Sequence, residues 1–462
     1  MSRHHANLSP LRCARRAPLL LPLVVLLATS CAQPLATAVD PHDVPGIAAS
    51  RGGHAAGTFS RTLEQTIGDI DHQLVVTLAP GADAAQVAQS YGAVLLDVAQ
   101  GFALLQRPAD QLLDVPVGLK TDPRVLSSEG NALALPAEAR QKSWAFDDGF
   151  GSMSACVTQG AALRLGLSRA QTVGRGNGVL VAVLDTGIDA HHPMFAGHLA
   201  PGWDFVDNDA DPTDSRDFVD EDEDGVVDGA YGHGTHVAGI VMLTAPQARI
   251  LPVRVLDDEG RGDVMTVAAG IRWAVGQGAR VINLSLGMTT TSSAVELALL
   301  EAQMRGVVVV TSAGNNGTEF PQEYPATSTR VIAVAASDPS NHPAIFTSFG
   351  SFVDLTAPGV AIRSAYPGDQ YRLWSGTSMS APFVSGTAAL LLGLHPQWSL
   401  ITVMNRLRQT TRPLVGGSFQ QIGRLGSGVL DVNDALADDR PAGDFGDRRL
   451  SSGSAGSAGE SP

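Results

Sequence analysis

Four short segments of this chain combine glycine with the residue types that acid–base and nucleophilic catalysis require. They cover residues 183–189, 232–239, 312–317 and 375–382. Asp185 follows an apolar run, and an acid at the end of a buried strand is costly unless a donor or a positive group meets it. Ser378 stands at the start of an apolar helical stretch, where free backbone amides and the helix dipole point. A serine hydroxyl needs an adjacent base to become a nucleophile, and His233 is the candidate.

Apolar runs alternate with helical stretches around these segments. The runs cover residues 179–184, 249–256, 281–286, 307–310 and 331–335, and the helical stretches cover 236–243, 264–275, 294–304 and 378–394. Uninterrupted apolar strands between helices predict an α/β domain, a parallel sheet with helices on both faces. In such sheets functional residues gather beyond the carboxyl ends of the strands, which is where the four segments fall.

In this order, the four segments resemble the subtilisin-like serine proteases, the subtilase family, over residues 179–437 or thereabouts. The resemblance implies that Ser378 attacks the scissile carbonyl, that His233 moves the proton, and that Asp185 holds the imidazole. It also implies an oxyanion hole formed by the Asn315 side-chain amide and the backbone N–H of Ser378.

The same resemblance implies a groove that binds an extended peptide as an added strand. Its two sides would be Gly260, Arg261 and Gly262, and Ser285, Leu286 and Gly287. Ala313 and Gly314, next to Asn315, would complete the walls of the first specificity pocket. Small residues at these places favour an open pocket for a large apolar side chain, on polypeptide substrates.

A smaller unit precedes this domain at residues 73–137. Its strands are expected at 73–78, 93–98, 102–106 and 124–128, with helices from residue 84 and over 108–115. The order βαββαβ predicts a small ferredoxin-like α+β fold. The pattern alone favours a structural or binding module. The family resemblance implies a propeptide that inhibits the enzyme, with residues 133–136 in the cleft and self-cleavage between about 134 and 160.

The N-terminus predicts export. Residues 1–31 form a signal peptide, with four arginines before an apolar run at 19–28. Residues 28–31 resemble a lipoprotein box that would place a lipid on Cys31, whereas residues 36–38 fit ordinary signal cleavage. The remaining divisions are a linker at 32–72, a maturation region at 138–175, the peptidase domain at 176–437 and a disordered tail at 438–462. The protein is therefore expected to be secreted, periplasmic or lipid-anchored to the cell envelope.

Acidic residues are concentrated in one loop. The chain has 31 Lys+Arg against 46 Asp+Glu, a net charge of −15, which argues against nucleic-acid binding. Asp220, Asp222, Asp224 and Asp228 surround Gly225 with the spacing of a calcium loop, although Tyr231 replaces the expected final Glu. The sequence thus predicts structural calcium and no organic cofactor, with a solvated acidic loop as the alternative.

Two other functions stay open at this point. The first is a catalytically weak protein whose subtilase fold only binds peptides. The second is a metal-dependent hydrolase, because His236 follows His233 at a ligand-like spacing, although no H-E-x-x-H motif is present.

Overall fold

The computed structural model describes residues 69–108, 115–138, 143, 145–220, 225–320 and 323–437. The signal peptide, most of the linker, the C-terminal tail and most of the second helix expected at 108–115 lie outside the described residues. Asp222 and Asp224 also lie outside them.

A nine-stranded sheet forms the centre of the larger unit, and its neighbouring strands are parallel except at one edge, where β15 is antiparallel to β16. From that edge the order is β15 (Thr411–Arg412), β16 (Val429–Leu430), β12 (Leu355–Pro358), β11 (Ile332–Ser337), β10 (Val308–Ser312), β9 (Val281–Leu284), β5 (Leu180–Asp185), β7 (Arg249–Arg254) and β6 (Trp203–Asp204). The predicted α/β fold with a parallel sheet is confirmed.

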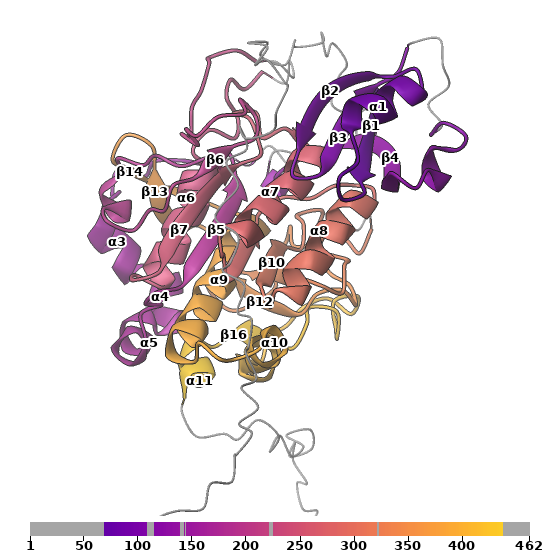
Figure 1. Ribbon diagram of the computed structural model, residues 1–462. Helices are drawn as coiled ribbons and strands as arrows, with labels where there is room; N and C mark the ends of the chain where they lie inside the picture. Colours follow the sequence, from indigo (N-terminus) through magenta and orange to yellow (C-terminus); the bar gives the residue numbers. More distant parts are fainter. Residues whose placement is uncertain are drawn as a thin grey trace, which may run out of the picture. The chain divides into compact units, whose positions relative to one another are not determined.

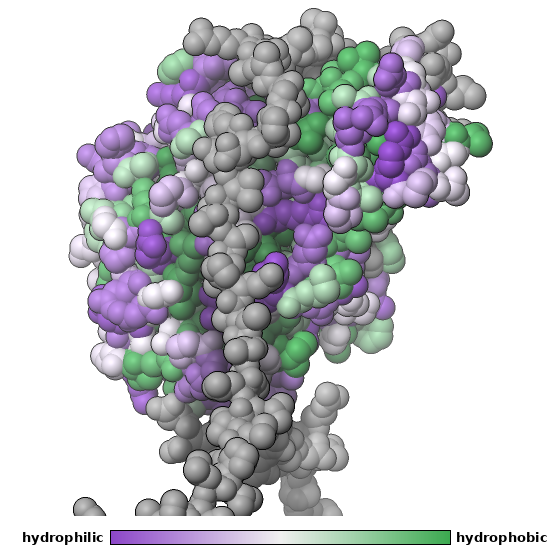
Figure 2. All heavy atoms as spheres, viewed as in Figure 1, coloured by the Kyte–Doolittle hydropathy of each residue, from purple (hydrophilic) through white to green (hydrophobic). Residues whose placement is uncertain are grey.

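Helices cover both faces of this sheet (Figure 1). Side chains alternate along β5, so that Val181 and Val183 share one core with α6 (His233–Thr244) and α9 (Thr377–Leu394). Ala182 and Leu184 share the opposite core with α7 (Val264–Gly276) and α8 (Ser293–Met304). The helix α9 is long and apolar enough to cross a membrane, but 89% of it is buried inside the structure. It is therefore a central core helix of this fold. On the face shown in Figure 2, hydrophobic and hydrophilic residues are interspersed.

Several elements outside this framework were not expected from the sequence. Three short helices, α3 (Met153–Thr158), α4 (Gly160–Leu165) and α5 (Leu167–Val173), occupy a stretch of weak periodicity. A two-stranded hairpin, β13 (Ile362–Tyr366) and β14 (Gln370–Trp374), precedes α9. The other described elements are the one-turn helices η2 (Leu119–Thr121) and η3 (Pro193–Phe195) and the helices α10 (Leu400–Gln409) and α11 (Val432–Leu436).

The smaller unit is an antiparallel sheet with one described helix. Its elements are β1 (Asp69–Leu78), α1 (Ala84–Ser90), β2 (Val94–Ala99), β3 (Phe102–Gln106) and β4 (Val125–Ala134). The strand order β2-β3-β1-β4 is that of the predicted ferredoxin-like arrangement. A short strand of the larger unit, β8 (Gly262–Asp263), adds to the edge of this sheet beside β4.

Alternation along β1 shows how the small sheet is buried on two sides. Leu74 and Val76 pack against α1, whereas Val75 joins the core that contains residues of α7 and α8. Phe102, on β3, lies in the same second core, and the guanidinium of Arg272 on α7 lies 4.1 Å from the centre of its ring. The small sheet is thus packed on the two helices (Figure 1).

Candidate functional site

Asp185 and His233 meet at the carboxyl end of the parallel sheet. Asp185 is the last residue of β5, and His233 is the first residue of α6. His233 Nδ1 and Asp185 Oδ1 are 2.6 Å apart, and both residues are fully buried. The backbone N–H of Thr186 donates a second hydrogen bond to the same carboxylate oxygen at 2.9 Å. This pairing leaves the opposite nitrogen of the imidazole, Nε2, to face the site.

A buried acid that the sequence analysis missed fixes the start of α6. Asp214 accepts hydrogen bonds from the backbone N–H of Gly232 and from both the N–H and the hydroxyl of Thr235. Burial raises the pKa of Asp214 to about 6, although these donors act in the opposite direction. Because the three bonds bracket His233, Asp214 sets where the imidazole can lie.

Ser378 stands in the first turn of α9, beside an amide that is held in one orientation. Asn315 Oδ1 accepts hydrogen bonds from the backbone N–H and the hydroxyl of Thr377, both at 2.9 Å. The Asn315 NH₂ group is therefore directed at the position next to Ser378 N. The hydroxyl of Ser285 donates to the Ser378 carbonyl at 3.0 Å, which fixes the helix start from the other side.

Glu138 places its carboxylate in the middle of this arrangement. Ser378 Oγ donates to Glu138 Oε2 at 2.5 Å, and His233 Nε2 lies 3.4 Å from the same oxygen. The other oxygen, Oε1, accepts from Asn315 Nδ2 at 2.9 Å and from the Ser378 N–H at 3.3 Å. Nothing in the sequence around residue 138 indicated this role, since a glutamate in a weakly patterned stretch carries no local signal.

The carboxylates on its two sides determine the charge of His233. Burial alone lowers the pKa of His233, but the charges and hydrogen bonds of Asp185 and Glu138 outweigh it and raise the pKa to about 10. Glu138 responds in the opposite sense: burial raises its pKa, and the bonds with His233, Ser378 and Asn315 lower it below its ordinary value. In this state the imidazole is protonated at neutral pH and cannot accept a proton.

The chain immediately before Glu138 runs through the predicted groove as an extended strand. Leu135 exchanges two backbone hydrogen bonds with Gly287, at 3.0 and 2.8 Å. On the other side Ala134 pairs with Gly262, in the strand pair β4–β8. A Cβ on Gly260 would lie 2.9 Å from the ring of Pro136, so glycine allows the strand to approach closely.

The other predicted substrate-binding residues occupy different environments. Arg261 is held by Asp257, which accepts from both its backbone N–H and its guanidinium. Leu286 is buried, and Ala313 belongs to a small apolar core behind the site. The structure therefore brings the glycines and backbone of these segments to the bound strand, while these side chains are held by the surrounding protein.

A carboxylate of the small sheet also caps a helix of the larger unit. Glu129 on β4 accepts hydrogen bonds at 2.8 Å from the Ser292 hydroxyl and from the backbone N–H groups of Ser293 and Ala294, at the start of α8. A negatively charged side chain at a helix N-terminus interacts favourably with the helix dipole and with the free backbone N–H groups there.

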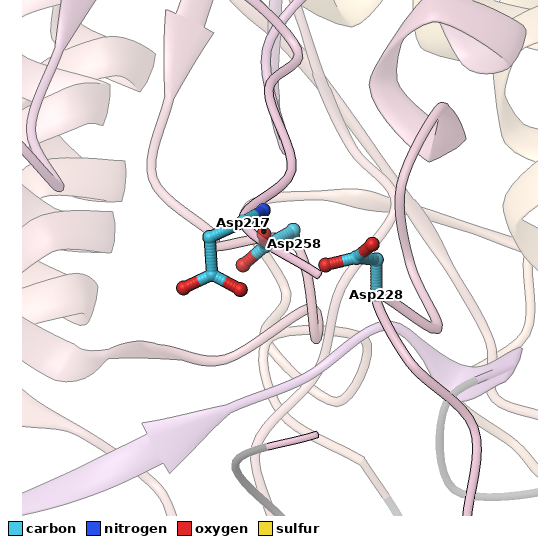
Figure 3. Close-up of side chains that lie close together, drawn as sticks. All are labelled: Asp217, Asp228 and Asp258. Carbon is cyan, nitrogen blue, oxygen red and sulfur yellow. Dashed lines mark hydrogen bonds between the residues drawn. The ribbon is translucent and has the colours of Figure 1, made fainter. Parts of the chain in front are cut away.

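Three acidic side chains gather where the loop before α6 meets the turn after β7. Oxygens of Asp217, Asp228 and Asp258 lie within 4.8 Å of one another (Figure 3). Of the four predicted calcium ligands, the structure places Asp228 in this group, while Asp220 accepts a hydrogen bond from Gly225 N. The sequence analysis missed the other two, Asp217 in the same loop and Asp258, which lies outside it. Carboxylate oxygens are the donors that calcium prefers, so the group fits that ion in donor type.

His236 has a different environment from that of a metal ligand. Its Nε2 lies 3.1 Å from the carbonyl oxygens of Ile362 and Arg372, and burial lowers its pKa to about 3. A neutral imidazole that donates to carbonyls is a core residue. Within the described residues, the group of three aspartates is the only cluster that could hold a metal ion.

Comparisons with known proteins find similarity over roughly half of the chain. The sequence pattern of the subtilase family matches residues 176–445. Thermitase of Thermoactinomyces vulgaris is 43% identical over 233 residues, which cover 48% of this chain and 78% of thermitase. Subtilisin BL of Lederbergia lenta is 38% identical over 269 residues, which cover 56% of this chain and 91% of that protein. A solved structure of proteases from Pseudoalteromonas arctica PAMC 21717 is similar with a TM-score of 0.54 at 30% identity, over 59% of this chain and 93% of that chain.

Proposed function

This chain belongs to the subtilase family of serine proteases, and from that premise we propose that Asp185, His233 and Ser378 form its catalytic triad. The observation that carries the proposal is the buried bond of 2.6 Å between His233 Nδ1 and Asp185 Oδ1 at the carboxyl end of the sheet. It leaves Nε2 on the side of the site where Ser378 Oγ lies. These positions support the assignment of His233 as the base, Asp185 as its orienting acid and Ser378 as the nucleophile.

The reaction follows from these positions. Ser378 Oγ bonds to the carbonyl carbon of the substrate while His233 Nε2 takes the hydroxyl proton, and Asp185 stabilises the imidazolium. The carbonyl oxygen, now negative, is met by Asn315 Nδ2 and the Ser378 N–H. Collapse of this intermediate breaks the peptide bond, and the proton passes from His233 to the leaving amine. Water then hydrolyses the acyl-enzyme by the same steps in reverse. Glu138 Oε1, negative and bonded to the same two donors, supports this assignment of the oxyanion hole.

The enzyme is further proposed to be made as an inhibited precursor. Residues 133–136 fill the groove, and Glu138 occupies both the oxyanion hole and the proton-accepting side of His233. The small sheet at residues 73–137 would hold this segment in place through its packing on α7 and α8. Activation would then require cleavage between about 134 and 160 and release of the small unit.

Export and calcium binding complete the proposal. Residues 1–31 are proposed to direct the chain out of the cytoplasm, with either a lipid on Cys31 or ordinary cleavage. Asp217, Asp228 and Asp258 would hold a calcium ion, which would neutralise carboxylates and tie the loop before His233 to the turn after β7. The ion has no part in the chemistry proposed above.

The test is covalent labelling of the mature protein by a fluorophosphonate, which reacts with an activated serine. Wild type should be labelled and should hydrolyse casein, whereas Ser378→Ala should do neither and should accumulate as uncut precursor. Ser380→Ala is the matched control, because Ser380 lies one half-turn along α9 and its hydroxyl donates to the Ala357 carbonyl at 3.1 Å. Absence of labelling in folded mature wild type would favour the alternative, a catalytically weak peptide-binding protein.

A further inference from the structure

A buried carboxylate lies beside the groove at the point where the two walls of the specificity pocket meet. A Cβ on Gly287 would stand 2.4 Å from Glu323 Oε2, and a Cβ on Gly314 would stand 2.7 Å from Glu323 Oε1. Both distances are shorter than real Cβ contacts, so a side chain at either glycine would have to displace the carboxylate, which lies against both. Glu323 itself is only 2% exposed.

The position of Glu323 is fixed by neighbouring backbone. Met288 and Tyr324 exchange two backbone hydrogen bonds, at 2.6 and 2.9 Å, which sets Glu323 next to Gly287. Asn316 Nδ2 donates to Glu323 Oε1 at 3.1 Å, and Asn316 N in turn is bonded to the Ser348 hydroxyl at 3.0 Å. The carboxylate is thus anchored to both walls.

Gly287 is also the residue that binds the extended strand, through its two bonds with Leu135. Gly314 directly precedes Asn315, whose side-chain amide donates a hydrogen bond to the carboxylate of Glu138. In the proposed binding mode, a substrate side chain just before the scissile bond would enter beside these two glycines, toward Glu323.

We infer that Glu323 forms the base of the first specificity pocket and makes the proteolysis proposed above selective for a lysine or arginine before the cleaved bond. This inference rests on the proposed function. A buried, ionised carboxylate is stabilised strongly by a cationic group beside it. An apolar side chain entering the pocket would exclude water from the carboxylate without supplying a charge to pair with it. An acid at the base of a pocket selects basic residues for the same reason in an unrelated protease fold. This inference differs from the expectation of a large apolar side chain, which considered only the wall residues, and the two predict opposite preferences in the test below.

The test uses mature protein and four peptides that differ only in the residue before the cleaved bond: arginine, lysine, glutamine or phenylalanine. Wild type should have a higher kcat/KM for arginine and lysine than for glutamine and phenylalanine. Glu323→Gln should lower kcat/KM for the two basic peptides by about thirtyfold or more, as loss of one partner of a buried charge pair does. It should leave the phenylalanine peptide unchanged or improved. Glu319→Gln is the control, since this glutamate lies four residues earlier and pairs with Arg424 at the surface.

Active-site titration with a fluorophosphonate distinguishes failure of the specificity inference from failure of the proposed protease function. Normal titration with a preference for phenylalanine, or an unchanged arginine-to-phenylalanine ratio in Glu323→Gln, overturns this inference alone. Failure of folded wild type to be labelled or to cleave any peptide overturns the proposed function. Should Glu323→Gln not fold, competitive inhibition of wild type by benzamidine but not by neutral benzamide supports the inference, and equal inhibition by both contradicts it.

Discussion

The hydroxyl of Ser378 donates its hydrogen bond to Glu138, at 2.5 Å, within a site where the imidazole of His233 is also turned toward that carboxylate. A side chain thus occupies the position that a reacting carbonyl would take. In the proposed precursor Glu138 is an internal residue, so the block would be built into the chain and would end only when this segment leaves the site.

Glu138→Gln should therefore accelerate maturation. The amide keeps the size of the side chain but loses the charge that pairs with His233 and strengthens the bonds from Ser378 and Asn315. Hydrogen bonds to charged groups contribute about 1.5–3 kcal/mol, so we expect the precursor to disappear about tenfold faster or more. The measurement is the half-life of the precursor band on gels after synthesis.

Asp147→Asn is the control for that experiment. Asp147 follows Glu138 closely, is exposed, and its side chain accepts a hydrogen bond from Gly149 N. Its maturation rate should match wild type. A Glu138→Gln precursor that matures at the wild-type rate, or more slowly, would show that the carboxylate does not restrain the site.

His233 should stay protonated in the precursor over an unusual pH range. Its pKa rises from 6.5 to about 10 through Asp185 and Glu138 together, so the associated stabilisation of the folded precursor relative to the unfolded chain is complete below pH 6.5 and is lost as pH rises through about 10. The pKa of Glu138 falls below its ordinary 4.5, so its contribution is present above that pH and is lost as the pH falls further. From these two groups, the folded precursor should accordingly be most stable against unfolding between about pH 4.5 and 6.5.

Nitrogen-15 NMR of labelled histidines in the Ser378→Ala precursor measures this directly, because the two ring nitrogens report protonation. The His233 signals should remain those of an imidazolium well above pH 7 and change toward pH 10. Adding Glu138→Gln should move the change to lower pH, whereas His236 should stay neutral across the range because burial lowers its pKa to about 3. A His233 titration near 6.5 in the precursor would contradict the assigned contacts.

Asn315→Ala should slow catalysis by mature enzyme about 10²–10³-fold in kcat, the loss that removal of this donor causes in subtilisin, a member of the same family. The donor acts on the negative oxygen of the transition state, so KM should change little. Steady-state kinetics on a single peptide substrate distinguish the two constants. A raised KM with an unchanged kcat would mean that Asn315 binds the substrate and the transition state equally well, which would contradict its role in the oxyanion hole.

The sequence was most informative where function lies in contiguous residues. The turn around His233 and the helix start at Ser378 carry their glycines and small residues within a few positions, and the apolar runs predicted the strands that position them. Glu138 and Asp214 could not be found this way, because each acts on residues far away in the sequence. The Glu138–Ser378 contact spans 240 positions, and no periodicity encodes it.

The same reason explains the acidic loop and the specificity pocket. Counting carboxylates along the loop identified Asp228, but its neighbour Asp258 comes from the turn after β7 and joins only through the fold. Glu323 similarly follows the Asn315 segment by several residues and reaches Gly287 only because Tyr324 pairs with Met288. The trio α3, α4 and α5 was missed because helices of six or seven residues display too few turns for a clear apolar stripe.

Calcium should stabilise the folded protein through Asp217, Asp228 and Asp258. An ion that binds only the folded state raises its stability by about 2.7 kcal/mol when present at a hundred times its Kd. The melting temperature of the Ser378→Ala precursor, which cannot digest itself, should therefore rise with added calcium and fall with a chelator. Asp228→Asn and Asp258→Asn should each weaken this response, because each removes a charged oxygen ligand.

Asp209→Asn supplies the comparison within the same loop, since the Asp209 carboxylate accepts from Asp211 N and lies outside the cluster. Its response to calcium should equal that of the parent. If chelation leaves the melting temperature unchanged, or if Asp209→Asn loses as much response as Asp258→Asn, the loop does not bind calcium through this group. A response to zinc but not to calcium would be unexpected for an all-carboxylate set, because calcium is the ion that prefers oxygen ligands alone. The comparison of the two metals thus tests whether the ligand set itself has been identified correctly.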